Sequence, residues 1–205
     1  YHKKAGNGTI IRNNYFHDTG GTAGRVIIKS EDGLIENNKF ERISSPPILI
    51  SPGIQALEGP FPKDIIIKNN EIIDCGFRYK WYTGTASTLG NISVITKNWD
   101  KTHNSYPLSN IKIIDNTIIN PASIAILMAN VKNAEIKGNK IINPVAKKPI
   151  GAGEIVNMDA SYAMFCHSVK DVILENNNIE EMSSNCQGEI GFTDSINLEE
   201  NLDIR

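Results

Sequence analysis

Four carboxylates that follow strand-like segments are the side chains best placed to do chemistry in this sequence: Glu31, Asp32, Glu58 and Asp100. Two carboxyl groups flanking a glycosidic bond can hydrolyse it, at a separation of about 5 to 5.5 Å with retention or about 6.5 to 9.5 Å with inversion of configuration. We expect the pair to join Glu31 or Asp32 to Glu58 or Asp100. One carboxyl group would be the general acid, with its pKa raised by its neighbour, and the other would activate water.

Four more residues near these carboxylates could bind a substrate. Arg25 and Lys29 could hold hydroxyl or carboxylate groups, Trp99 could stack on a sugar ring, and His103 adds a polar group beside it. Structural interpretations stay open for the same residues. The run Glu31-Asp32-Gly33 is an ordinary polar turn, Trp99 could pack a loop onto a sheet, and His103 could be a hydrogen-bonded structural residue.

Other reaction types find less support in the residues. A polysaccharide lyase acting on uronates needs an Arg or Lys base and commonly Ca²⁺ held by clustered carboxylates, and no dense acidic cluster is visible. The spacing of Cys75, Cys166 and Cys186 signals neither a zinc site nor a disulfide framework. We therefore expect no metal and no cofactor. A non-catalytic glycan-binding or structural module is the third possibility.

Composition narrows the class of partner. The 205 residues carry 21 Lys and Arg against 23 Asp and Glu, a net charge of -2, whereas a nucleic-acid or anionic-membrane binder would have a basic excess. No apolar run approaches the roughly 20 residues that cross a bilayer. The expected partner is a carbohydrate, and the oligomeric state stays open. The length suits one domain, residues 1–205.

A repeat decides the fold class. The pattern Ile/Leu-x-x-Asn-x-Ile/Phe occurs six times, with its asparagines at 14, 38, 70, 116, 139 and 177. The spacings of 24, 32, 46, 23 and 38 residues describe a unit of about 23 residues with insertions of different length. Such a unit is too short for a strand, a crossover helix and a return, but it accommodates two or three short strands. It buries an apolar face only by stacking on its own copies.

The stacked units predict an all-β solenoid, a parallel β-helix of about seven or eight coils. Besides the repeat, strands are expected at 25–29, 47–51, 91–96, 123–128 and 154–158. Coils about 4.8 Å apart would align the repeat asparagines in a hydrogen-bonded column, and Asn also tolerates the left-handed conformation of a sharp corner.

The same stacking would assemble a groove. If Val26 and Ile28 point inward, Arg25, Ile27 and Lys29 point outward, because side chains alternate along a strand. The loops that follow this strand position in successive coils, near residues 30–32, 53–60 and 98–104, would then form one wall, to which Asp159 and His167 of later coils would add. Side chains one or two coils apart would start about 4.8 or about 9.6 Å from each other, which covers both glycosidase spacings.

The segments Thr9–Phe16, Leu34–Phe40 and Asp64–Ile72 resemble repeats of right-handed parallel β-helix proteins of the pectate-lyase-like superfamily, over roughly residues 8 to 182. The first half, with Leu57-Glu-Gly-Pro-Phe-Pro62 before a new repeat, is similar to β-helix α-1,3-galactosidases and their relatives. That resemblance implies an exported bacterial, metal-independent, inverting exo-glycosidase. The sequence has no segment for the small β-barrel of those enzymes, so we expect it to be part of a longer protein.

Overall fold

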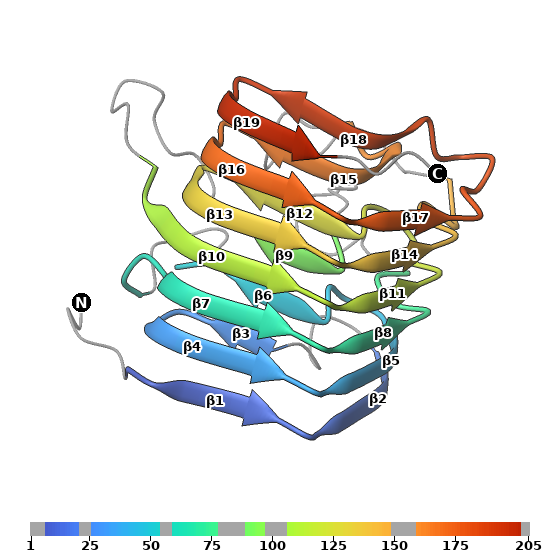
Figure 1. Cartoon of the computed structure of the whole chain (residues 1–205). Helices are drawn as coiled ribbons and strands as arrows, with labels where there is room; N and C mark the ends of the chain where they lie inside the picture. Colours follow the sequence, from blue (N-terminus) through green and yellow to red (C-terminus); the bar gives the residue numbers. More distant parts are fainter. Residues whose placement is uncertain are drawn as a thin grey trace.

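A computed structural model describes residues 7–20, 26–53, 59–77, 89–96, 106–148 and 159–201, with side chains up to residue 195. Every regular element in these segments is a β-strand, and the strands form three parallel sheets (Figure 1). No helix among them is long and apolar enough to cross a membrane. The predicted all-β parallel solenoid is therefore confirmed.

The three sheets, called A, B and C, each take one strand from every coil. Sheet A has seven strands: β1 (Thr9–Arg12), β4 (Glu31–Glu36), β7 (Lys63–Lys68), β10 (Leu108–Ile114), β13 (Val131–Lys137), β16 (Lys170–Glu175) and β19 (Ile196–Asn201). Sheet B has six: β2 (Tyr15–Thr19), β5 (Lys39–Ile43), β8 (Glu71–Ile73), β11 (Thr117–Ile119), β14 (Lys140–Ile142) and β17 (Asn178–Glu180). Sheet C has six: β3 (Val26–Ile28), β6 (Ile48–Ile50), β9 (Ile92–Val94), β12 (Ile126–Ala129), β15 (Tyr162–His167) and β18 (Gly188–Thr193).

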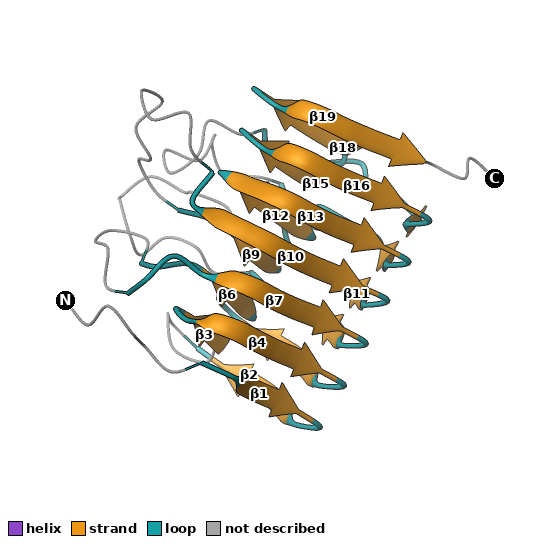
Figure 2. Cartoon of the chain, turned by 60° about the vertical axis from the view of Figure 1, so that its left-hand side comes forward, coloured by secondary structure: helices purple, strands orange, loops and turns teal. Residues whose placement is uncertain are grey.

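The chain passes through sheets A, B and C in turn, so six coils are complete and β19 begins a seventh. Viewed from the side, the strands of sheet A lie one above another in sequence order (Figure 2). Four of the predicted additional strands correspond to β3, β6, β9 and β12, whereas 154–158 lies outside the described residues. The third strand of the fifth coil, β15, was not predicted.

The asparagine ladder between sheets A and B is confirmed. From Asn14 to Asn177, each Asn Nδ2 donates to the Oδ1 of the repeat Asn in the next coil, at 2.9 to 3.1 Å. Each backbone N–H in the ladder from Asn14 to Asn139 donates to the same oxygen. The amide of Asn116 also donates to the carbonyls of Ile67 and Ile114. These bonds satisfy buried polar groups at the corner and fix the coils in register.

One detail of the ladder differs from the sequence-based expectation. The left-handed residue of each corner is the one before the repeat asparagine: φ is 58° at Asn13, 53° at Asn69 and 64° at Gly138. The repeat asparagines themselves do not have positive φ. Two residues thus share the turn, the first adopting the left-handed backbone and the second carrying the ladder.

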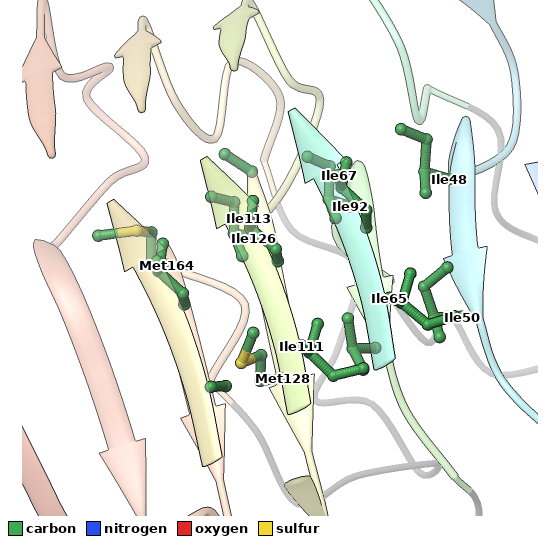
Figure 3. Packing of buried hydrophobic residues seen from close by; sticks show 14 of the residues in the cluster. Ile48, Ile50, Ile65, Ile67, Ile92, Ile111, Ile113, Ile126, Met128 and Met164 are labelled. Atoms are coloured by element: carbon green, nitrogen blue, oxygen red, sulfur yellow. The ribbon is translucent and has the colours of Figure 1, made fainter. Parts of the chain in front are cut away.

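Columns of aliphatic side chains fill the solenoid. Ile35, Ile67, Ile113 and Ile136 occupy equivalent places in neighbouring strands of sheet A and are fully buried. Facing them, Ile48, Ile92, Ile126 and Met164 form the corresponding column of sheet C (Figure 3). Val26 and Ile28 are buried and Ile27 is exposed, as predicted. Since β-branched side chains suit a pleated surface, the abundance of Ile is accounted for by these columns.

Sheet C differs from the others because both faces of its middle strands, β6 to β15, are buried. Leu49, Leu127 and Phe165 belong to a second apolar cluster on its outer side, with Leu89 and Ile124 beside them. Sheets A and B alternate between buried and exposed residues instead. Their outer faces, and the edges between the sheets, are therefore where described side chains meet solvent.

Candidate functional site: a polar groove at the edge of sheet B

The carboxylates predicted to be catalytic lie where the chain passes from sheet C to sheet A, or outside the described residues. Glu31 and Asp32 begin β4, and Ser30 separates them from Lys29. Glu58 and Asp100 lie outside the described residues, as do Arg25, Trp99 and His103. A Cβ built on Gly59 would lie 3.1 Å from both the Cβ and the carbonyl oxygen of Lys29, so the chain just after Glu58 does approach this edge.

Glu31 and Asp32 have definite structural surroundings. Glu31 forms an ion pair with Lys63 of the next coil at 3.3 Å. Asp32 has a φ of 58° and aligns with Asp64, Asn110, Asn133 and Asp171, all of which have positive φ. Neighbours in this column are hydrogen bonded, with Asn110 Nδ2 donating to Asp64 Oδ1 at 2.7 Å. The position thus selects short polar residues that tolerate a left-handed backbone, and the catalytic role of Asp32 stays a prediction.

Two polar residues expected at the same edge are separated by β15. His167, the last residue of that strand, lies at the predicted place, with Nδ1 2.7 Å from Thr193 Oγ1. Asp159 instead precedes the strand and accepts a hydrogen bond from the backbone N–H of Ser161 at 2.9 Å. Asp159 is therefore at the opposite end of the strand, and placing it on the same wall was wrong.

The opposite edge, between sheets B and C, holds a groove of about 740 Å³. Five of its lining residues come from five successive coils: Asp18, Arg42, Asp74, Asn120 and Asn143. Each follows its ladder asparagine by four residues, and each has a φ between 49° and 52°. They form a polar column parallel to the coil axis.

Hydrogen bonds join neighbouring residues of the column in two groups. Arg42 Nη2 donates to Asp18 Oδ2 at 2.7 Å, and its Nε donates to the other carboxylate oxygen at 2.5 Å. Asn143 Nδ2 donates to Asn120 Oδ1, and Asn120 Nδ2 donates to Asp74 Oδ1, both at 2.9 Å. The Arg42 guanidinium, followed by the contact with His17, holds the pKa of Asp18 well below its usual range. Asp18 is thus a carboxylate and not a proton donor near neutral pH.

An aromatic ring and a cation stand beside the polar column. Phe77 is 39% exposed although it is a large apolar side chain, and it lines the groove. Lys147 Nζ lies 5.3 Å from the centre of its ring. Cys75, at the base of the groove, has no exposed surface, and burial raises the pKa of its thiol to about 12. The chemistry that the groove offers a ligand therefore comes from its carboxylates, amides and cations and from Phe77.

The outer face of sheet B continues the polar surface next to the first two coils. Tyr15 Oη donates to Glu41 Oε2 at 2.5 Å, and this hydrogen bond raises the pKa of the phenol. Two side chains already contact the Tyr15 ring: the His17 ring stacks on it with centroids 4.4 Å apart, and Lys39 Nζ lies 5.7 Å from its centre. Tyr15 is consequently less suited to stack on a ligand than Phe77.

Taken together, the groove has the side chains that bind polyhydroxylated ligands, namely planar amides, carboxylates and a guanidinium next to an aromatic face. Asp18 and Asp74 are two coils apart, so their backbones are about 9.6 Å apart by strand spacing. Among the described residues, no group of three His, Cys, Asp or Glu side chains could hold a metal ion.

This groove was not predicted from the sequence, although a signal for it is present there. Position four after the ladder asparagine carries a polar residue in all six repeats, ending with Glu181. Its chemical identity varies among Asp, Arg, Asn and Glu. What the residues share is the left-handed backbone, which a search for repeated side-chain types does not detect.

The architecture defines the class: a right-handed parallel β-helix. In agreement, residues 2–101 match a family model described as right handed beta helix region. The fold and this match support a carbohydrate-active or a structural β-helix protein, both of which are built on this scaffold. No curated protein matches the chain.

Proposed function

We propose that this β-helix binds carbohydrate, and that an extended glycan lies in the groove parallel to the coil axis. The observation that carries the proposal is the polar column, which offers one hydrogen-bonding side chain per coil beside the exposed face of Phe77. Successive side chains start about 4.8 Å apart, close to the length of one sugar ring in an extended chain. A repeating ligand could therefore meet a similar contact at each unit.

Binding is tested by titrating a panel of neutral and uronate oligosaccharides into the protein by calorimetry. Phe77→Ala removes the aromatic face and Asp74→Asn removes a charge while keeping a side chain that tolerates the left-handed backbone. We expect each change to weaken binding at least about tenfold, since stacking and a charged hydrogen bond are each worth about 1.4 kcal/mol or more.

Lys132→Ala is the matched control, because Lys132 is exposed on sheet A, away from the groove. It should leave the affinity unchanged. Equal affinities for the parent protein and both groove variants would contradict a binding site in the groove.

Hydrolysis is the second candidate function, and the specific observation in its favour is the presence of Asp18 and Asp74 on one groove, two coils apart. Their spacing suits an inverting mechanism if the carboxyl groups lean toward each other, because that mechanism needs about 6.5 to 9.5 Å. The specific enzyme that we propose for this case is an exported, exo-acting, α-galactosidase-like glycosidase. The pairs predicted from the sequence, Glu31 or Asp32 with Glu58 or Asp100, are the alternative to Asp18 and Asp74 as the catalytic carboxylates.

Product analysis on α- and β-galactosides separates these possibilities. If Asp74→Asn abolishes turnover even at ligand concentrations that saturate its weakened binding site, the groove carboxylates do the chemistry. If Asp32→Asn or Glu58→Gln abolishes turnover instead, the carboxylates at the edge between sheets C and A do the chemistry. Turnover of uronates with formation of a double bond would indicate a lyase, whereas binding without turnover would indicate a non-catalytic glycan-binding module.

A further inference from the structure

A row of apolar side chains crosses the outer face of sheet A in the first three coils. Ile10, Leu34 and Ile66 are directly aligned by the strand register. Ile10 is 59% exposed and Ile66 is 37% exposed. Large aliphatic side chains stacked on an open sheet face are a common feature of protein interfaces. This row is called the apolar stripe.

Charged residues flank the apolar stripe in an ordered way. On β4, both flanking residues are acidic, Glu31 and Glu36. On β7, the residues paired with them are both basic, Lys63 and Lys68. Each acid forms an ion pair with the base of the next coil at 3.3 Å. The second coil is thus negative on both sides of the stripe and the third coil is positive on both sides.

This pattern is complementary to itself under a two-fold rotation. An axis that runs parallel to the strands, between β4 and β7 and in the plane of contact, places β4 of one copy against β7 of the other. Leu34 then faces Ile66 of the second copy, and each glutamate faces a lysine. An axis through β4 would instead oppose Glu36 to itself and Arg12 to Lys68. Like charges disfavour that arrangement.

We propose that two copies of this chain associate face to face through the apolar stripe of sheet A. The contact is isologous, the commonest symmetry of protein dimers. In it, β1 faces β10, where the methylene stem of Lys112 covers Ile10. The groove residues lie at the end of sheet B and none belongs to sheet A, so the dimer leaves the groove open.

The size of the contact sets its strength. The four facing strands, β1, β4, β7 and β10, have four to seven residues each. They cover roughly 20 by 20 Å at the usual strand spacing and rise, or about 400 Å² of each partner. The total of about 800 Å² is below the roughly 1,000 Å² that stable specific interfaces exceed, so the contact belongs to the weak, transient class. The dimer should therefore be in rapid exchange, with a dissociation constant of about 10 to 100 μM.

Charge reversal provides the test, measured by sedimentation velocity over a range of concentrations. The all-lysine variant carries Glu31→Lys and Glu36→Lys, and the all-glutamate variant carries Lys63→Glu and Lys68→Glu. We expect each variant alone to sediment as a monomer because like charges oppose across the axis. A mixture of the two should form a heterodimer at least as stable as the parent dimer, since every pair across the contact is then opposite in charge.

Two further proteins complete the experiment. Lys132→Glu with Lys170→Glu changes the same number of charges on β13 and β16, which have no counterpart across the axis, and it should dimerise like the parent. If charge reversal prevents folding, Leu34→Thr with Ile66→Thr, which keeps β-propensity, should weaken dimerisation at least about tenfold. A parent protein that stays monomeric at about 0.5 mM, a mixture that does not associate, or an unchanged Thr variant would overturn the proposal.

Discussion

At the scale of single residues, the ladder asparagines and the groove column make different demands on similar side chains. Asn116 is buried, and its amide and carbonyl oxygen bond to two other repeat asparagines and to main-chain groups. Asn120, four residues later, lines the groove and bonds to Asp74. The first kind of position stabilises the fold, whereas the second presents polar atoms to a ligand.

Replacing Asn116 by alanine should lower the free energy of unfolding by about 2 to 4 kcal/mol, because it leaves several buried donors and acceptors without partners. Urea denaturation followed by circular dichroism measures the change. Asn178→Ala is the control: this residue is exposed and its side-chain amide donates to Glu180, so the substitution should lower the free energy of unfolding by less than about 0.5 kcal/mol. Equal midpoints for the two variants would show that the ladder contributes little.

The ladder could be predicted from the sequence because one residue type recurs at one phase relative to the aliphatic residues. The groove could not be predicted in the same way. Asp18 and Arg42 differ in charge, yet they occupy equivalent corners and bind each other. Their equivalence lies in the backbone conformation, and that conformation becomes visible only once the coils are aligned.

At the scale of elements, the two-residue corner between sheets A and B determines how tightly coils can stack. Its first position holds Asn, Asp or Gly, with φ near 55° to 64° at Asn37 and Gly138. At Gly138 a side chain has no room, since a Cβ there would lie 2.2 Å from Asp115 Oδ1 of the preceding coil. Two features therefore favour glycine at position 138: the nearby Asp115 side chain and the left-handed backbone.

Gly138→Ala should therefore lower the free energy of unfolding by about 1 to 3 kcal/mol, combining the cost of a left-handed alanine with the crowding of Asp115. Thermal or urea unfolding measures it. In an Asp115→Gly background the crowding is gone, so the cost of the same substitution should fall. At Gly20 a Cβ would meet nothing within 4 Å, and Gly20→Ala should be nearly neutral. An identical cost in both backgrounds would exclude crowding between the two corners.

Strand positions were easier to predict than the connections between them. Short β-branched runs identified β3, β6, β9 and β12 to within a few residues. β15 was missed because Tyr162–His167 contains no run of Ile or Val and is buried by its surroundings. Tertiary packing, and not local propensity, selects that strand.

At the scale of the whole molecule, the coil is the unit that can be added or removed. The shortest spacing between ladder asparagines is 23 residues, from Asn116 to Asn139. Deleting residues 117–139 removes β11, β12 and β13 and brings β10 next to β16 with the aliphatic columns in phase. The register of the ladder is preserved, with Asn177 as the new neighbour of Asn116.

We expect the protein with this deletion to fold into a shorter solenoid that unfolds cooperatively, at a lower urea midpoint because less apolar surface is buried. Circular dichroism and hydrogen exchange measure this. Deleting only residues 117–128 removes about half a coil and should prevent folding, because sheets and columns no longer align. If both deletions behave alike, register between coils does not govern the fold.

The one-way sense of the ladder has a consequence for how the two ends of the solenoid can be extended. In each bond between ladder asparagines, from Asn14 to Asn177, the lower-numbered residue donates and the higher-numbered residue accepts. From Asn38 onward, each ladder amide also donates to a main-chain carbonyl of the preceding coil. A coil stacked before Asn14 would therefore have to supply a donor amide, and a coil stacked after Asn177 an acceptor, so the two ends are not interchangeable.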